Sequence, residues 1–164
     1  MPGRSKSRER ALQVLFSCDM RKLDVQEALD AFYETLHSTG DVPEARLDRD
    51  RFMEALVYGT LDRQAAIDET LTKFSQNWRL ERMPSVDRNI LRVATYELMR
   101  GESAAAIVID EAIELARRFC GDESIAFVNG VLDAVAKSIE ATQPAPRSNS
   151  KPEKMPDKTV DKAK

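Results

Sequence analysis

Four cations stand close together near the start of the chain, at alternate positions: Arg4, Lys6, Arg8 and Arg10. Glu9 is the only acid among residues 1–10, so this stretch has a net charge of +3. Closely spaced Lys and Arg side chains are the groups that neutralise nucleic-acid phosphates. The cluster therefore predicts binding of a few phosphates. The alternative is a set of solvated surface cations that binds nothing.

Charge is distributed unevenly along the rest of the chain. Residues 141–164 also have a net charge of +3, whereas residues 11–140 have a net charge of −9. A protein with such an acidic body cannot coat nucleic acid over its whole surface, but a local basic patch can still hold phosphates. Any nucleic-acid contact is expected to begin near residues 4–10.

Residues that could support catalysis are few. His37 is the single histidine and follows an apolar stretch beside a loop, so an exposed polar residue is predicted rather than a catalytic base. Acids cluster at residues 110–114 and at Asp122 and Glu123, but helical carboxylates usually form a solvated face or stabilise a helix start. The six glycines form neither GxxxxGK[ST] nor GxGxxG. We therefore expect no enzyme activity, no cofactor and no metal.

Length and composition limit the class of protein. A chain of 164 residues with 42% hydrophobic and 32% charged residues fits one globular domain. Cys18 and Cys120 belong to no CxxC motif, so both are expected to be reduced thiols in a reducing compartment. The sequence has no apolar leader and no uncharged apolar window of membrane-spanning length, so we expect a cytoplasmic protein without membrane contact.

Apolar residues recur with helical spacing from residue 8 to residue 140, and no convincing alternation predicts a strand. The predicted fold class is all-α, a compact bundle of six or seven helices. The expected helical stretches are 8–19, 25–36, 48–75, 86–100, 104–119 and 124–140.

Several small residues are predicted to shape these helices. Gly59 either lets a neighbouring helix approach closely or divides the long stretch into two helices. Ser85 is the expected N-cap of its helix, and Gly101 and Gly121 are the expected stops of theirs. Pro144, Pro146, Pro152 and Pro156 lie in a segment without an apolar face, which predicts a domain over 1–140 and a disordered basic tail over 141–164.

Four motifs carry a resemblance to a known family. They are RERALQVLF at residues 8–16, VDRNILRVATYEL at 86–98, IVIDEAIELARRF at 107–119 and FVNGVLD at 127–133. In this order they resemble the NusB family of bacterial transcription antitermination factors, over roughly residues 4–140. The resemblance implies two packed helical subdomains and no catalysis. It also implies binding of single-stranded boxA RNA with the small-subunit ribosomal protein NusE, in an antitermination complex on RNA polymerase that acts chiefly on ribosomal RNA genes.

The resemblance also implies roles for individual residues. The arginine-rich first helix of the family corresponds to Arg4, Lys6, Arg8 and Arg10, which the charge pattern singles out independently. Family residues near the RNA match Phe16, Phe119, Glu123 and Phe127, and a family residue that faces the ribosomal protein matches Asp87. Aromatic rings stack on unpaired bases only if they are exposed. We expect Phe119 to be exposed, whereas Phe16 and Phe127 also fit the buried stripes of their helices.

The chain departs from the family pattern at a few positions. Phe16 stands where a tyrosine is common, so the ring is kept and the hydroxyl is lost. Asp110 replaces a frequent asparagine, and no proline precedes that motif.

Two other functions stay open on the sequence alone. One is a detached accessory domain of an RNA methyltransferase system, since a related helical domain occurs there. The other is a helical adaptor that binds only protein, which the acidic body favours. The family also leaves open whether the chain is a monomer or a homodimer.

Overall fold

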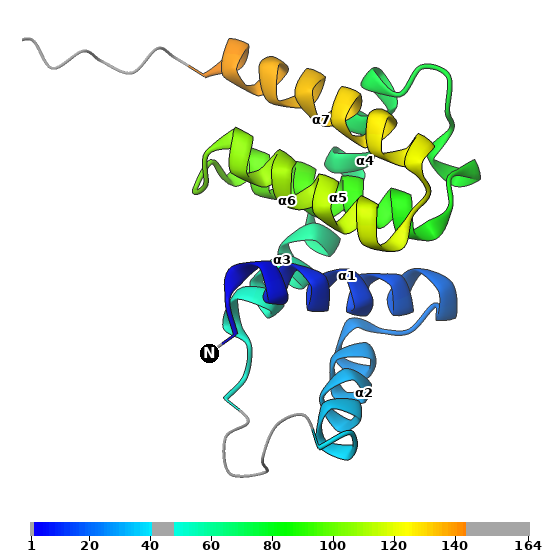
Figure 1. Ribbon diagram of the computed structural model, residues 1–164, viewed down its shortest axis with the longest axis vertical. Helices are drawn as coiled ribbons and strands as arrows, with labels where there is room; N and C mark the ends of the chain where they lie inside the picture. The colour runs from blue at the N-terminus through cyan, green and yellow to red at the C-terminus, as the bar shows by residue number, and fades with distance from the viewer. Residues whose placement is uncertain (1, 41–47, 144–164) are drawn as a thin grey trace, which may run out of the picture.

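The computed structural model describes residues 2–40 and 48–143, which are helical almost throughout and contain no strand (Figure 1). The elements are α1 (Arg4–Arg21), α2 (Val25–Ser38), α3 (Arg51–Asp62), α4 (Gln64–Phe74), the short 3₁₀ helix η2 (Leu80–Arg82), α5 (Ser85–Arg100), α6 (Ala105–Phe119) and α7 (Asp122–Thr142). The all-α prediction is confirmed. The proposed tail begins two residues too early, because α7 includes Ala141 and Thr142, and residues 144–164 lie outside the described residues.

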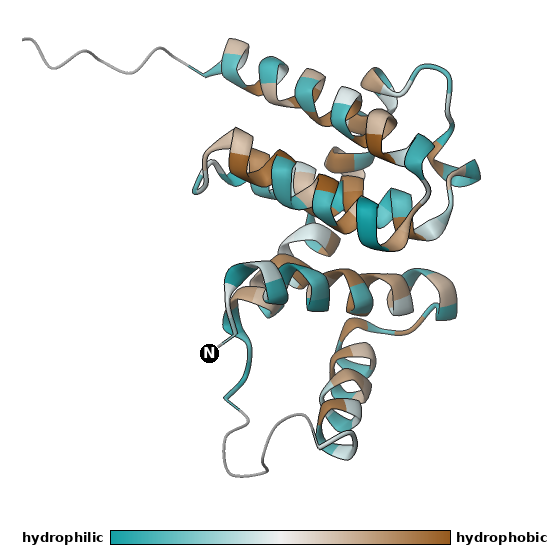
Figure 2. Cartoon of the chain, in the orientation of Figure 1, coloured by the Kyte–Doolittle hydropathy of each residue, from teal (hydrophilic) through white to brown (hydrophobic). Residues whose placement is uncertain are grey.

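The helices form two packed groups, α1–α3 and α4–α7 (Figure 1). Helix α5 lies at their junction and packs against α1, α3, α4, α6 and α7. A helix with neighbours on every side needs apolar residues around most of its surface. Consecutive residues of α5, from Ile90 to Ala94, are accordingly all buried. Hydrophobic faces of the surrounding helices turn inward on this core (Figure 2).

The long predicted helix over 48–75 is two helices, α3 and α4, and Gly59 is not where they separate. The chain turns at Arg63, after Asp62. Gly59 instead allows a close approach, because a Cβ atom at this position would collide with the ring of Tyr96 on α5. The first of the two roles considered for Gly59 is therefore confirmed.

Two of the three predicted helix ends need correction. Gly101 ends α5 in the left-handed conformation at φ 67°, as expected. Ser85 is already inside α5, and its hydroxyl donates to Asp19 on α1 at 2.9 Å instead of capping the helix. Gly121 is the N-cap of α7, since Cys120 is the C-cap of α6. The hydroxyl of Ser85 thus bonds to a different helix, although its place at the start of α5 favours a local capping bond.

None of the described helices combines the length and hydropathy needed to cross a membrane.

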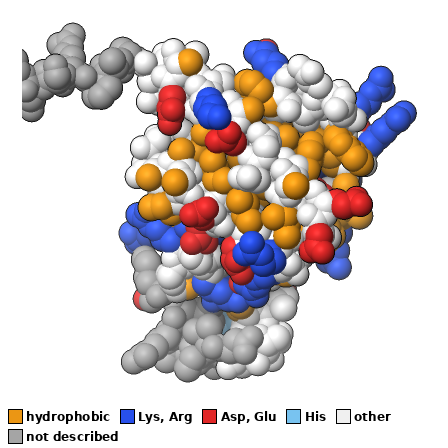
Figure 3. Space-filling model, turned by 45° about the horizontal axis from the view of Figure 1, so that its top comes forward, with side chains coloured by type: hydrophobic (Ala, Val, Ile, Leu, Met, Phe, Trp, Pro, Cys, Tyr) orange, Lys and Arg blue, Asp and Glu red, His pale blue; other side chains and the backbone are white. Residues whose placement is uncertain are grey.

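Hydrophobic and charged side chains are mixed on the surface. On the face in Figure 3, hydrophobic side chains gather near the middle, and Lys and Arg side chains lie mostly at the margins. Basic groups on this face form separate clusters rather than one continuous surface.

Candidate nucleic-acid interface

The first turns of α1 present two of the four predicted cations to solvent. Arg4 is exposed, with its guanidinium 5.0 Å from the centre of the Phe52 ring. Lys6 is exposed over about half of its side chain and forms an ion pair with Glu9 at 3.3 Å. Cations at a helix start do not stabilise the helix, because the N-terminal end of the helix dipole is positive. Both side chains can therefore turn to a phosphate at little cost to the fold.

Arg8 departs from the expectation that it faces a ligand. It is 4% exposed, and its Nε and Nη2 atoms donate to the two carboxylate oxygens of Glu97 on α5, at 2.7 and 2.8 Å. The hydrogen bond to Glu97 raises the pKa of Arg8. The charge pattern pointed to a surface contact, whereas the structure places this guanidinium in a buried pair that joins α1 to α5. In this conformation Arg8 offers nothing to RNA.

Arg10 is intermediate in exposure between the exposed Arg4 and Lys6 and the buried Arg8. Its side chain is mostly buried, and Nη1 donates to Asp50, the N-cap residue of α3, at 3.3 Å. Its Nε is buried without a hydrogen-bond partner in the described part of the chain. The guanidinium therefore ties α1 to α3, and it also borders a groove between α1 and α2 together with Lys6 and Arg21.

Phe16 and Phe119 are the exposed rings of the predicted set. Phe16 on α1 is 37% exposed and Phe119 at the end of α6 is 44% exposed. The expectation for Phe119 is met, and Phe16 is a surface ring rather than a core residue. Since stacking on an unpaired base requires an open ring face, both residues satisfy that condition.

Arg118 lies beside Phe119 and Glu9 and is part of the same candidate site, although the sequence pattern did not indicate it. Its guanidinium lies 5.3 Å from the centre of the Phe119 ring and donates to Glu9 of α1 at 2.9 Å. Burial favours a higher pKa for Glu9, but the hydrogen bonds from Arg118 and Lys6 outweigh it and lower the pKa. Glu9 thereby holds one cation from each helix. The sequence signal that could have indicated Arg118 is its place next to Phe119 at the end of a predicted helix.

The last predicted RNA contacts lie on α7. Glu123 is exposed in the first turn, where a negative charge also stabilises the helix through its interaction with the helix dipole. Phe127, one turn later, is half-buried, and its ring centre is 6.0 Å from that of Trp78. Neither position decides between a structural role and contact with RNA.

Asp87 lies in the first turn of α5 but is not open to solvent. It is 8% exposed and accepts a hydrogen bond from Ser124 Oγ of α7 at 2.7 Å. A carboxylate held in this way connects α5 to α7 and presents little surface to a partner. A role for Asp87 at a protein interface would be mainly indirect, through the position of α7.

The Cys120 thiol also contacts Asp87, and this gives a testable pH dependence. Burial, reinforced by the hydrogen bond and negative charge of Asp87, raises the pKa of Cys120 to about 12. The nucleophilic thiolate is therefore scarce at pH 8. We expect alkylation of Cys120 by iodoacetamide to be much slower than that of the unfolded chain, and to accelerate up to pH 10 without levelling off. Peptide mass spectrometry would show this, and a plateau below pH 10 would contradict it.

No group of three or more His, Cys, Asp or Glu side chains suited to a metal ion occurs within residues 2–40 and 48–143. The arrangement at α1 and α6 instead combines exposed cations, open aromatic rings and one carboxylate that links them. Such a surface can bind phosphates and stack bases.

Comparison with known proteins identifies the family of the chain. The family model of the NusB family matches residues 5–137. The transcription antitermination protein NusB of Solibacter usitatus is 48% identical over 92% of this chain and all of its own length. That of Sorangium cellulosum is 44% identical over 85% of this chain and 95% of its own length.

Solved structures show the same likeness. A structure of T. maritima NusB superposes with a TM-score of 0.69 at 30% identity, over 83% of this chain and 92% of that one. Another, of antitermination factors NusB and NusE in complex with double-stranded RNA, superposes with a TM-score of 0.68 at 25% identity, over 82% of this chain and 96% of that one. The helical arrangement and the sequence motifs lead to one conclusion: the chain belongs to the NusB family of transcription antitermination proteins.

Proposed function

We propose that this protein binds the single-stranded boxA element of nascent RNA together with the ribosomal protein NusE. The pair would join an antitermination complex on RNA polymerase during ribosomal RNA transcription, and the protein would act by binding, without catalysis. The observation that carries the proposal is the juxtaposition of Arg118 and Phe119 with the basic start of α1, through the ion pairs of Glu9.

The exposed cations supply affinity in this proposal. Arg4 is exposed and has no ion pair within the described residues, and Lys6 and Arg118 share the buried Glu9, so one of these two can contact a phosphate while the other stays paired with Glu9. Phosphate contacts orient the RNA but do not distinguish its sequence. Sequence preference would come from bases that stack on Phe16 and Phe119 and from hydrogen bonds to their edges.

Family membership and a solved relative support the partner. A structural relative contains NusE and double-stranded RNA beside NusB, which supports a ternary assembly of this chain with NusE and RNA. The acidic body of the protein, with a net charge of −9 over residues 11–140, would speed docking of a basic ribosomal protein. A protein-only adaptor would share this charge but would not need exposed rings beside the cations.

Fluorescence anisotropy with a labelled boxA-like RNA and a scrambled RNA, over a salt series, tests the proposal. We expect the boxA-like RNA to bind more tightly, and NusE to strengthen that binding. Replacing Arg4 and Lys6 with alanine is expected to reduce the magnitude of the log–log salt slope by about 1.4, since each single-strand phosphate contact contributes about 0.7.

The matched control replaces Lys73 and Lys137, which are exposed and removed in sequence from the basic start of α1. This double variant removes the same charge, so its salt slope should stay close to that of the original protein. Equally weak binding of both RNAs, unchanged by NusE, would contradict the proposal and favour the adaptor.

A further inference from the structure

Trp78, the only tryptophan of the chain, stands on the surface in the turn between α4 and η2. Its side chain is 56% exposed. Tryptophan is enriched at interfaces, because its ring offers a large apolar surface and its N–H a hydrogen bond. Among the described aromatic residues its ring has one neighbour, Phe127 of α7, with the ring centres 6.0 Å apart and the ring planes at 55°.

The turn that carries Trp78 is anchored on α4. Ser75 is buried, and its hydroxyl donates to the carbonyl of Leu71 at 2.7 Å. The backbone N–H of Trp78 then donates to the carbonyl of Ser75 at 2.9 Å. These bonds fix the backbone under the indole ring. A ligand that bound here would meet a side chain on a preorganised support.

A hollow of about 360 Å³ lies between this turn and α7. Trp78, Phe127 and the amide side chains of Gln76 and Asn77 line it, and no charged residue does. Gly130 on α7 also lines it, and a Cβ atom at this position would have open space around it, with nothing within 4 Å. The hollow thus offers aromatic surfaces and amide groups, which suit the faces and the edges of a nucleobase.

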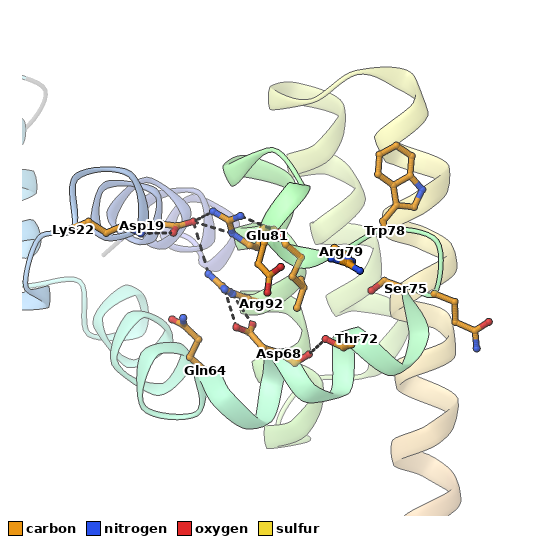
Figure 4. A pocket seen from close by; sticks show the side chains of 13 residues that line it. Asp19, Lys22, Gln64, Asp68, Thr72, Ser75, Trp78, Arg79, Glu81 and Arg92 are labelled. Carbon is orange, nitrogen blue, oxygen red and sulfur yellow. Dashed lines mark hydrogen bonds and ion pairs between the residues drawn. The ribbon is translucent and has the colours of Figure 1, made fainter.

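Trp78 also borders a larger groove, of about 770 Å³, with a different chemistry (Figure 4). In its depth, Arg92 pairs with Asp68 at 2.8 Å, and Arg88 pairs with Asp19. Arg79 is next to Trp78 in sequence, is exposed, and has no ion pair within the described residues. Trp78 therefore separates a neutral hollow from a surface with an available cation.

We propose that Trp78 and Phe127 form a second stacking platform, which receives one unpaired RNA base in the hollow with the adjoining phosphate toward Arg79. The inference rests on the proposed RNA-binding function and extends it to a residue that neither the charge pattern nor the family motifs indicate. A protein segment is the competing occupant. The uncharged amide-lined hollow beside a free cation favours a nucleotide, because it provides for both base and phosphate.

Tryptophan fluorescence, excited selectively over the three tyrosines, reports on this site, since the chain has one tryptophan. Titration with the boxA-like RNA is expected to quench it saturably, with the midpoint that anisotropy gives. Trp78→Ala should weaken RNA binding about 5- to 150-fold, the effect of losing one stacked base. Trp78→Phe, which keeps a ring, should retain most of the affinity.

A second variant reaches the hollow without changing the indole. Gly130→Leu fills it from α7 and improves helix propensity, so the fold should be retained while RNA binding and quenching fall. Ile107→Ala, which removes another exposed apolar side chain, is the matched control and should bind normally.

The outcomes separate this inference from the proposed function. RNA binding that is normal by anisotropy but leaves the fluorescence and the Trp78→Ala affinity unchanged would overturn the platform alone. Quenching by NusE but not by RNA would overturn it in favour of a protein contact. Absence of any selective RNA binding would overturn both.

Discussion

Replacing Arg8 with alanine is expected to lower the free energy of unfolding by about 3–5 kcal/mol, because it leaves the Glu97 carboxylate buried without its partner. Glu97 is 6% exposed and accepts two hydrogen bonds from the one guanidinium. Arg8 also packs over the Phe52 ring, 5.3 Å from its centre, so truncation removes apolar contact as well. Urea denaturation followed by circular dichroism measures the change.

An exposed pair is the appropriate control. Arg117 and Glu114 on α6 pair at 3.0 Å with both side chains more than half exposed, so Arg117→Ala should cost at most about 1 kcal/mol. Replacing Arg8 and Glu97 together with Met and Leu should recover most of the stability, since no charge is then left unpaired. Equal costs for Arg8→Ala and Arg117→Ala would show that the Arg8 pair is accessible to water.

This pair affects how RNA-binding variants should be interpreted. A loss of binding in Arg8→Ala would reflect a displaced α1 or a smaller folded fraction, since the guanidinium does not reach the surface. Arg4 and Lys6 are free of this complication because both are exposed. Variants of Arg4 and Lys6 therefore measure the contribution of the first helix to RNA binding without a large change in the stability of the fold.

Periodicity was sufficient to predict the helices but not every place where they end. The all-α fold and the stop at Gly101 followed from apolar spacing and from what glycine alone permits, whereas for Gly59 the sequence left both a close approach and a helix break open, and the structure shows the close approach. The division between α3 and α4 at Arg63 has no Gly or Pro to mark it. Packing on α5 sets that turn, and a single sequence does not contain this information.

The candidate site was predictable in composition and less so in exposure. The motif that contains Arg8 also contains Glu9, and both signs of charge fit a solvated helix as well as a buried contact. Arg8 and Glu97 are separated by 89 positions, so their pairing depends on the packing of α1 on α5. Arg118 was overlooked for the same reason, since its link to Glu9 is visible only once α6 lies beside α1.

Asp50 is the second residue whose loss should have a large effect, because its one carboxylate accepts three hydrogen bonds that join α1 to α3. It caps α3 by accepting from the N–H of Met53 at 3.0 Å, and it accepts from Ser7 Oγ at 2.9 Å and from Arg10 at 3.3 Å. Both Asp50 and Ser7 are almost completely buried. Asp50→Ala should therefore cost about 3–5 kcal/mol, since it removes a helix cap and leaves a mostly buried cation without its partner.

Asp24 provides the matched control for this prediction. It caps α2 through the N–H of Gln26 at 3.0 Å but is exposed, so Asp24→Ala should cost only about 1 kcal/mol. Asp50→Asn should fall between the two, because asparagine caps a helix equally well and still accepts from Ser7 while the charge opposite Arg10 is lost. Equal losses in the Asp50→Ala and Asp24→Ala variants, measured by urea denaturation, would mean that Asp50 acts as a cap alone. A larger loss at Asp50 would show that the basic start of α1 owes its position to a buried acid that also holds Ser7 and Arg10.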